Sequence, residues 1–223
     1  MSVPPDSQAH GSREQVLAKV RRATRDGRGN VAPSYAGLER KYVREGTMTP
    51  EQRLELMIER LREYDAEVVE TTPGELPAAI AAHLAASGRH TFVVPEGSPA
   101  EWLAPGFEWK IDRGLSTADI EKTDGVVTAA FCGIADSGTI VLHHSPAEGR
   151  RVISLLPDWH LCILRASQVV ETFPEYVDRC AEPPVLATYV SGPSATADIE
   201  MTRIKGVHGP RFLNVTLVRD DRT

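Results

Sequence analysis

Apolar residues recur at helical spacing in the first half of the chain. Leu54, Met57, Ile58 and Leu61 stand three and four residues apart, which is the pattern of a helix with one buried face. They follow Thr49-Pro50-Glu51-Gln52, where threonine can cap the helix, proline suits its first turn and glutamine occupies the capping-box position. The pattern predicts a helix that begins directly after Thr49.

A second helix is predicted by the same kind of signal. Thr72-Pro73-Gly74-Glu75 repeats the capping signature, and Leu76, Ile80 and Leu84 continue it at helical spacing. Gly88 then offers the glycine with which many helices end. We expect a helix that is capped at Thr72 and stops at Gly88.

The N-terminal part of the chain has a weaker pattern. Residues 12–26 fit a helix with Ser12 as its cap and a narrow apolar stripe, and residues 1–11 show no pattern of a regular element. We predict an N-terminal helical arm over residues 1–48 and an α/β domain over residues 49–223. Such an arm often covers a neighbouring subunit, so a homo-oligomer is possible.

Short β-branched and apolar runs alternate with helical segments over the rest of the chain, and this alternation indicates an α/β fold. We predict a mainly parallel sheet flanked by helices. A short helix follows Ser116, and a helix interrupted at Pro174 spans residues 168–176. Two strands follow each other directly around residues 136–138, which favours a hairpin or bulge within that sheet. The predicted strands are residues 66–70, 91–94, 108–111, 125–134, 139–143, 160–165, 185–190 and 212–218.

Composition and charge narrow the possible partners. The 223 residues are 41% hydrophobic and 25% charged, as in an ordinary soluble domain, and the formal net charge is −6. Sequence-independent binding of nucleic acid needs a dense basic surface, so we expect no nucleic-acid partner. No apolar run approaches membrane-spanning length and the N-terminus lacks the regions of a signal peptide. We therefore expect a cytoplasmic protein with no membrane partner.

Cysteine and histidine usage gives no metal signature. Cys132, Cys162 and Cys180 are widely spaced and form no C-x-x-C pair, and the first two lie in apolar runs. We therefore expect no iron–sulfur cluster, zinc or other metal on this chain. His143 and His144 are neighbours on a predicted strand, so they would face opposite sides of the sheet.

A polar, glycine-rich segment over residues 191–211 lies between two predicted strands and is the main candidate for a ligand site. Ser194, Thr196 and Asp198 can cap a short helix, whose free N–H groups would bind an anion. The alternative is a capped loop-to-helix turn with solvated carboxylates. The segment's candidate ligand-binding residues are Gly192, Ser194, Thr196, Gly206, Gly209 and Arg211.

A second polar loop supplies the remaining candidates. Asp136, Ser137, Gly138 and Thr139 combine a carboxylate, two hydroxyls and a glycine, although the same residues are typical of a tight turn. Ligands of open α/β sheets bind beyond the carboxyl ends of strands, so we expect both loops to share one pocket. The candidate catalytic residues are Asp136, Asp198, Glu200 and His208, and His208 is the preferred acid–base group.

The chain lacks the familiar cofactor motifs. It has no G-x-S-x-G elbow and no phosphate-binding G-x-x-x-x-G-K-[ST], and its only G-x-G follows a helix instead of a strand. Amino-acid side chains cannot accept a hydride without a cofactor. A redox role would therefore need a carrier bound in an unfamiliar way or supplied by another protein.

Four linked motifs resemble the LutC/YkgG family, whose members consist largely of the LUD (lactate utilisation) domain. They occupy residues 135–142, 154–160, 191–200 and 206–210, and the resemblance extends over roughly residues 50–220. The chain has Ala195 where the family's G-P-S-R-T-A-D-I-E has arginine. If that arginine binds an anionic ligand, Arg211 or Arg203 could replace it.

The resemblance implies a fold similar to the NagB/RpiA/CoA-transferase group and a part in oxidising L-lactate to pyruvate. It also implies two iron–sulfur partner proteins, LutA-like and LutB-like, which would carry the clusters that this chain cannot hold. On this hypothesis the chain binds a small anionic ligand or organises its partners, and is not redox-active alone. The alternatives are a self-sufficient enzyme acting on a phosphorylated, CoA or folate substrate, and a sensory or structural domain.

Overall fold

The computed structural model describes residues 7–25, 37–39, 41–193, 195–197, 203–205 and 209–220. The chain divides into two compact units, Met1–Tyr42 and Val43–Thr223. In the first unit, α1 (Ser7–Arg25) begins at Ser7 and not at the predicted Ser12. Gln8 and Ala9 favour helix and extend it toward the N-terminus.

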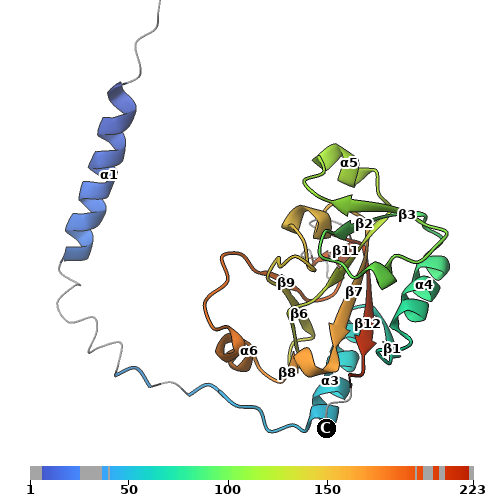
Figure 1. Ribbon diagram of the computed structural model, residues 1–223. Helices are drawn as coiled ribbons and strands as arrows, with labels where there is room; N and C mark the ends of the chain where they lie inside the picture. Colours follow the sequence, from blue (N-terminus) through green and yellow to red (C-terminus); the bar gives the residue numbers. More distant parts are fainter. Residues whose placement is uncertain are drawn as a thin grey trace, which may run out of the picture. The chain divides into compact units, whose positions relative to one another are not determined.

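The second unit is built on a six-stranded sheet in which every neighbouring pair is parallel, as Figure 1 shows. The prediction of a mainly parallel sheet is thereby confirmed. In spatial order the strands are β1 (Glu67–Thr71), β12 (Phe212–Val218), β7 (Trp159–Arg165), β4 (Gly125–Ala129), β2 (Thr91–Pro95) and β3 (Glu108–Asp112).

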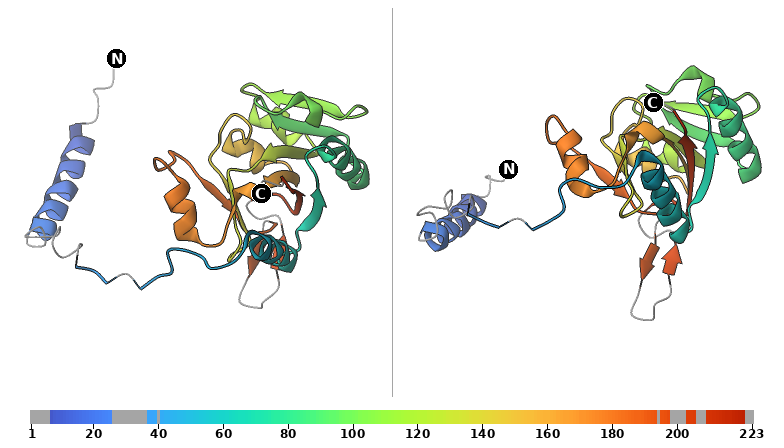
Figure 2. Two further views of the ribbon diagram at one scale, coloured as in Figure 1. Left: turned by 60° about the horizontal axis from the view of Figure 1, so that its bottom comes forward. Right: turned by 90° about the horizontal axis from the view of Figure 1, so that it is seen from below.

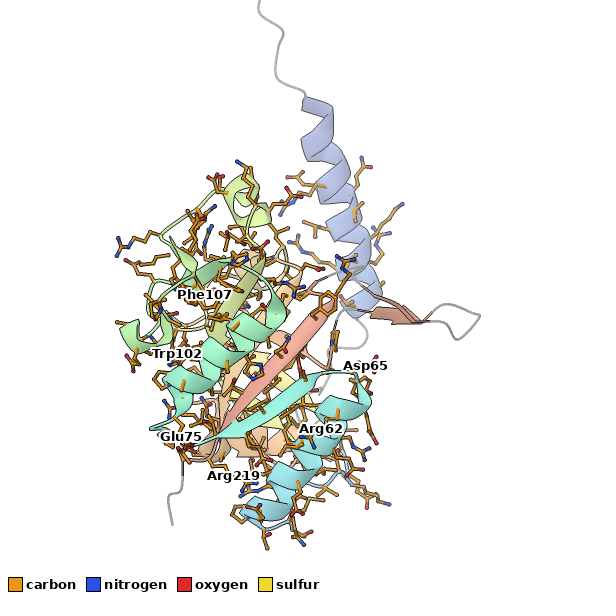
Figure 3. All side chains as sticks on the ribbon, turned by 90° about the vertical axis from the view of Figure 1, so that its right-hand side faces the viewer. Arg62, Asp65, Glu75, Trp102, Phe107 and Arg219 are labelled. Carbon is orange, nitrogen blue, oxygen red and sulfur yellow. The ribbon has the colours of Figure 1, made fainter. Side chains whose placement is uncertain are left out.

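Helices cover both faces of this sheet, because alternate residues of each strand point to opposite sides. Cys162 and Leu164 of β7 pack with α3 (Pro50–Glu63), whereas Leu161 and Ile163 pack with α4 (Leu76–Ser87). Figure 3 looks onto the edge strand β1 and shows α3 and α4 on either side of it.

The capping predictions for the two helices had different outcomes. At α3 both bonds of the capping box form between Thr49 and Gln52, as predicted. At α4 the prediction of a Thr72 cap is wrong, because Glu75 is the cap residue and makes no side-chain cap bond. The Thr72 hydroxyl donates instead to Glu75 Oε2 at 2.9 Å, and the Glu75 N–H closes a turn onto Thr72 O.

A second, four-stranded sheet lies on the α3 side of the main sheet. The predicted hairpin exists, but it belongs to this sheet and not to the main one. The apolar run 125–134 serves both sheets: the Ala130 N–H still bonds to β7 at Ile163, and the Phe131 N–H bonds to Val141 of the second sheet. The strands are, in order, β8 (Val169–Val170), β5 (Cys132–Ile134), β6 (Thr139–Leu142) and β9 (Thr188–Val190).

Two predicted helices are corrected. Residues 168–176 are not one helix: Val169 and Val170 form β8, and α6 (Phe173–Arg179) begins after its Thr172 cap with Pro174 in the first turn. A proline in that position starts a helix instead of breaking it. In the region of the predicted helix after Ser194, residues 195–197 form a strand.

That strand, β10 (Ala195–Ala197), pairs antiparallel with β11 (Arg203–Lys205), and Figure 2 shows the two strands projecting from the second unit. The pairing of alternating residues with a partner strand outweighs the local capping pattern in this segment. The remaining short elements are η1 (Ala100–Trp102), α5 (Thr117–Glu121), η2 (Arg151–Ser154) and η3 (Ala166–Gln168).

Among the described helices, none combines the length and the apolar character needed to cross a lipid bilayer.

The turn between β5 and β6 gives a test of this packing. Gly138 has φ of +60°, and a Cβ added there would lie 2.6 Å from the Cβ of Arg60 on α3. We expect Gly138→Ala to lower the free energy of unfolding by about 1–3 kcal/mol, measured by urea denaturation. Gly74→Ala is the matched control because nothing lies within 4 Å of its added Cβ. Equal, small effects of the two substitutions would contradict this account of the turn.

Candidate functional site

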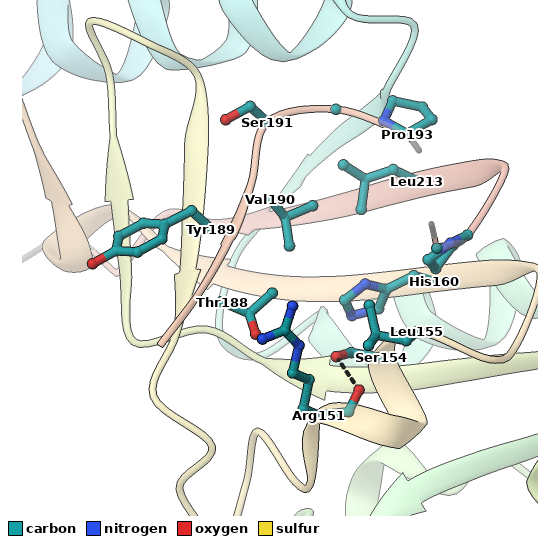
Figure 4. A pocket seen from close by; sticks show the side chains of 13 residues that line it. Arg151, Ser154, Leu155, His160, Thr188, Tyr189, Val190, Ser191, Pro193 and Leu213 are labelled. Atoms are coloured by element: carbon teal, nitrogen blue, oxygen red, sulfur yellow. Dashed lines mark hydrogen bonds between the residues drawn. The ribbon is translucent and has the colours of Figure 1, made fainter. Parts of the chain in front are cut away.

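A cavity of about 280 Å³ lies between the two sheets, over the amino ends of β7 and β12 (Figure 4). Leu213 and His160 are paired neighbours on the main sheet and form its floor. The segment that runs from β9 to Pro193 forms the opposite wall. The lining residues are Arg151, Ser154, Leu155, His160, Thr188, Tyr189, Val190, Ser191, Gly192, Pro193, Gly209, Pro210 and Leu213.

The β9 wall is held in place by its backbone pairing with β6 and by the close approach of Gly192 to Tyr64. Val190 pairs with Ile140 of β6, which fixes the strand before it leaves the sheet at Ser191. Gly192 follows with φ of +87°, and a Cβ there would lie 2.5 Å from the Cβ of Tyr64. Only glycine fits this conformation and this distance, so the wall can pass close to the end of α3.

Arg151 brings a positive charge to the cavity. It opens η2, whose turn is closed by the Ser154 hydroxyl donating to Arg151 O at 3.0 Å. In Figure 4 the Arg151 side chain extends along the cavity toward Thr188. No carboxylate in the described part of the chain forms an ion pair with it. The cavity therefore offers a guanidinium to an anionic ligand.

His160 is the titratable group of the cavity floor. The residue is 1% exposed, and its Nε2 lies 2.8 Å from the hydroxyl of Thr128 on β4. Burial lowers the pKa of His160 to about 4, so the imidazole is neutral at neutral pH. A neutral imidazole has one nitrogen that accepts a hydrogen bond, and with Nε2 at Thr128, Nδ1 is the nitrogen left for a ligand.

A buried carboxylate organises the loop between β6 and η2. Glu148 is 4% exposed and accepts hydrogen bonds from the N–H groups of His143 and His144 and from the Ser145 hydroxyl. His144 has φ of +59°, and its ring bridges Gly149 O and the Thr188 hydroxyl at 2.8 Å each. This loop thus connects η2, which carries Arg151, to Thr188 on the opposite wall.

The polar loop after β5 does not line the cavity. Asp136 and Ser137 are exposed, and the loop is a tight turn in which the Gly138 N–H donates to Ala135 O. Thr139 links it to the candidate segment, since its hydroxyl lies 2.7 Å from that of Ser191 and 2.8 Å from that of Ser137. The two predicted loops therefore meet behind the β9 wall, while only the second one reaches the cavity.

The other predicted residues have three different placements. Gly192 and Gly209 line the cavity. Arg211 is exposed and makes a bidentate ion pair with Asp158, with N–O distances of 2.5 and 2.9 Å, which raises the pKa of Arg211. Thr196 lies in β10, and its side chain is outside the described residues, as are Ser194, Asp198, Glu200, Gly206 and His208.

The cysteine thiols do not suit a metal cluster. Cys132 and Cys162 are fully buried, as expected, and burial raises their pKa to about 11 and about 12. Metal-bound cysteines are thiolates, which these surroundings disfavour. Among the described residues, no three histidine, cysteine or acidic side chains gather as ligands for a metal ion. The donor set of the described chain therefore does not fit an iron–sulfur cluster.

Arg151 and His160 were missed by the sequence reasoning. Arg151 follows another arginine in a stretch without regular periodicity. His160 lies at the start of an apolar strand, where a histidine is expected to be a structural residue packed in the core. The only available signal was that His160 ends the motif at residues 154–160.

The comparisons with known proteins agree with this architecture. The LUD domain model matches residues 47–218. The chain belongs to the LUD domain family. A protein named lactate utilization protein C from Deinococcus radiodurans is 36% identical over 213 residues, which cover 92% of this chain and 94% of that protein. A protein of the same name from Geobacillus thermodenitrificans is 28% identical, over 75% of this chain and 78% of the relative.

A solved structure resembles the LUD domain described here. It is the crystal structure of a DUF162 family protein from Deinococcus radiodurans, with a TM-score of 0.64 and 34% sequence identity, covering 77% of this chain and 99% of that one. Together these similarities place the chain in the LutC/YkgG family and support a role in lactate utilisation.

The buried His160 of this LUD domain predicts a pH dependence of stability. Its pKa is lower in the folded state than the ordinary value of 6.5, so the unfolded state binds the proton more readily. The free energy of unfolding therefore has its full value above pH 6.5. It falls by up to roughly 3 kcal/mol as the pH decreases toward 4.

We expect His160→Gln to reduce this dependence, because glutamine does not titrate but can still bond to Thr128. Urea denaturation of both proteins between pH 4 and pH 7 measures the difference. Parallel pH profiles for the wild type and the variant would contradict a buried, neutral His160.

Proposed function

We propose that this chain is the non-cluster subunit of an iron–sulfur system that oxidises L-lactate to pyruvate, and that it holds the small carboxylate in the cavity between the sheets. The observation that carries the proposal is the guanidinium of Arg151 at a small cavity with both polar and apolar walls, in a member of a lactate-utilisation family. About 280 Å³ lies just below the usual 300–1,000 Å³ range for ligand pockets, which suits a small metabolite.

The cavity has complementary groups for a 2-hydroxy acid. Arg151 can bind a carboxylate through two parallel N–H bonds, which is the preferred geometry of a guanidinium with a carboxylate. The neutral ring of His160 can accept a hydrogen bond from the 2-hydroxyl, and Val190 and Leu213 supply apolar surface for the methyl group. These roles assign binding and orientation of the substrate to this chain.

Electron transfer is assigned to other proteins. Conversion of L-lactate to pyruvate releases two electrons and two protons, and side chains cannot store the electrons. The buried thiols of Cys132 and Cys162 do not suit cluster ligation, as described above. We infer that two iron–sulfur proteins, LutA-like and LutB-like, receive the electrons on their clusters.

Reconstitution tests this assignment. The chain is purified alone, and its two proposed partners are purified with their clusters intact. Lactate-dependent reduction of a dye should be seen only when all three are mixed. Sustained oxidation of lactate by this chain alone, without an added carrier, would refute the division of labour.

Substitution of Arg151 tests the cavity. We expect Arg151→Gln to weaken binding of L-lactate or pyruvate by about 10- to 100-fold, because a charge-assisted hydrogen bond contributes about 1.5–3 kcal/mol. Isothermal titration calorimetry measures the binding, and the reconstituted assay should show the matching loss.

Arg113→Gln is the control, because Arg113 is an exposed arginine that pairs with Glu96 outside the cavity. It should bind like the wild type. Equal affinities of the wild type and Arg151→Gln for L-lactate or pyruvate would contradict the proposal that the ligand binds in this cavity.

A further inference from the structure

A second cavity, also of about 280 Å³, lies at the opposite ends of the same strands. Ala166 and Ser167 follow the last residue of β7, and Arg219 and Asp220 follow the last residue of β12. The first turns of α3 form another wall, and Figure 3 labels Arg219 in this region. The carboxyl ends of parallel strands are where ligands of open α/β sheets bind.

Three arginines from three different elements line this cavity. They are Arg53 of α3, Arg179 at the end of α6 and Arg219 after β12. Arg219 is neutralised by Glu51 and Glu70, at N–O distances of 3.0 and 2.5 Å. Arg179 donates one hydrogen bond to Ser167 O at 3.2 Å and has no carboxylate partner among the described residues.

Arg53 is the least satisfied of the three. Its Nε is shielded from solvent and has no hydrogen-bond partner. Within the described chain no carboxylate forms an ion pair with its guanidinium. A buried donor without a partner destabilises the folded chain, because it has lost its hydrogen bond to water and gained none in return. The cavity thus contains an arginine nitrogen that is shielded from solvent and that an anion from outside the chain would give a hydrogen-bond acceptor.

Two carboxylates line the cavity and both are already engaged, Glu51 with Arg219 and Asp220 with Ser167. Asp220 accepts the Ser167 N–H at 2.9 Å and the Ser167 hydroxyl at 2.5 Å, so both of its oxygens are directed to the loop after β7. These bonds lower the pKa of Asp220 and fix its charge. Of the charged residues that line the cavity, three are arginines and two, Glu51 and Asp220, are carboxylates, so the lining itself carries one more positive than negative charge.

We propose that this second cavity binds a phosphate group, either as inorganic phosphate or as part of a phosphate monoester. A phosphate offers three or more acceptor oxygens, which can be shared between guanidiniums that approach from two elements. The inference goes beyond the proposed function, because the site lies in a separate cavity and uses none of the residues assigned to lactate.

Equilibrium binding of inorganic phosphate tests the site. Thermal unfolding and calorimetry are measured with the full chain at increasing phosphate, with sodium chloride held at matched ionic strength. A saturable rise in melting temperature is expected, since a ligand that binds the folded state stabilises it. Glycerol phosphate is titrated in parallel, and tighter binding than that of inorganic phosphate would identify a monoester as the preferred form.

Substitutions locate the site. We expect Arg53→Gln and Arg179→Gln each to weaken phosphate binding by about tenfold or more, and Arg113→Gln to leave it unchanged. Circular dichroism checks that the variants are folded, and Arg179 is exposed, so its replacement tests the site even if Arg53→Gln does not fold. Absence of saturable binding, or equal affinity in all three variants, would overturn the proposal.

Phosphate binding in the second cavity is expected to be independent of lactate binding in the first. Arg53→Gln should bind L-lactate like the wild type, and Arg151→Gln should bind phosphate like the wild type. A loss of both ligands in one variant that is folded by circular dichroism would count against two separate sites.

Discussion

The candidate site depends on one buried carboxylate. Glu148 accepts three hydrogen bonds from residues 143–145 and so fixes the loop that leaves β6. His144 then extends this network across the cavity mouth to Thr188. Both walls of the first cavity, η2 on one side and β9 on the other, are therefore positioned by a single group that does not line it.

The proposed functions occupy opposite ends of the same two strands. β7 begins near His160, on the floor of the first cavity, and ends near Ser167, at the cavity lined by arginines. The second sheet lines both cavities: β9 forms a wall of the first, and Val169 of β8 lines the second. The first cavity, at the amino ends, needs the wall that β9 supplies, whereas the second lies beyond the carboxyl ends, the usual place for a ligand of an open α/β sheet.

The fold could be predicted where the signal is local. The spacing of Leu54, Met57, Ile58 and Leu61, together with Thr49 and Gln52, is a property of one segment, and α3 follows it closely. The segment at residues 195–197 failed because its strand depends on a partner at residues 203–205. For the same reason the apolar run 125–134 was predicted as a single strand. Nothing within that run indicates that it serves two sheets.

The candidate site could be predicted only in part, because some of its residues come together through long-range contacts. Gly192 and Gly209 were found because glycine next to a strand indicates a close backbone approach. Arg151 and His160 become neighbours of these glycines only through the pairing of Leu213 with His160 and the loop held by Glu148. Such long-range contacts leave no mark on the spacing of residues along the chain.

The position of β12 has a consequence for how the chain acquires its structure. This last strand lies between β1 and β7, and Glu67 near the start of the domain pairs with Asn214 near its end. The edge strand β1 has no other partner in the sheet. β1 must therefore wait with an open edge until β12 has been synthesised and has left the ribosome.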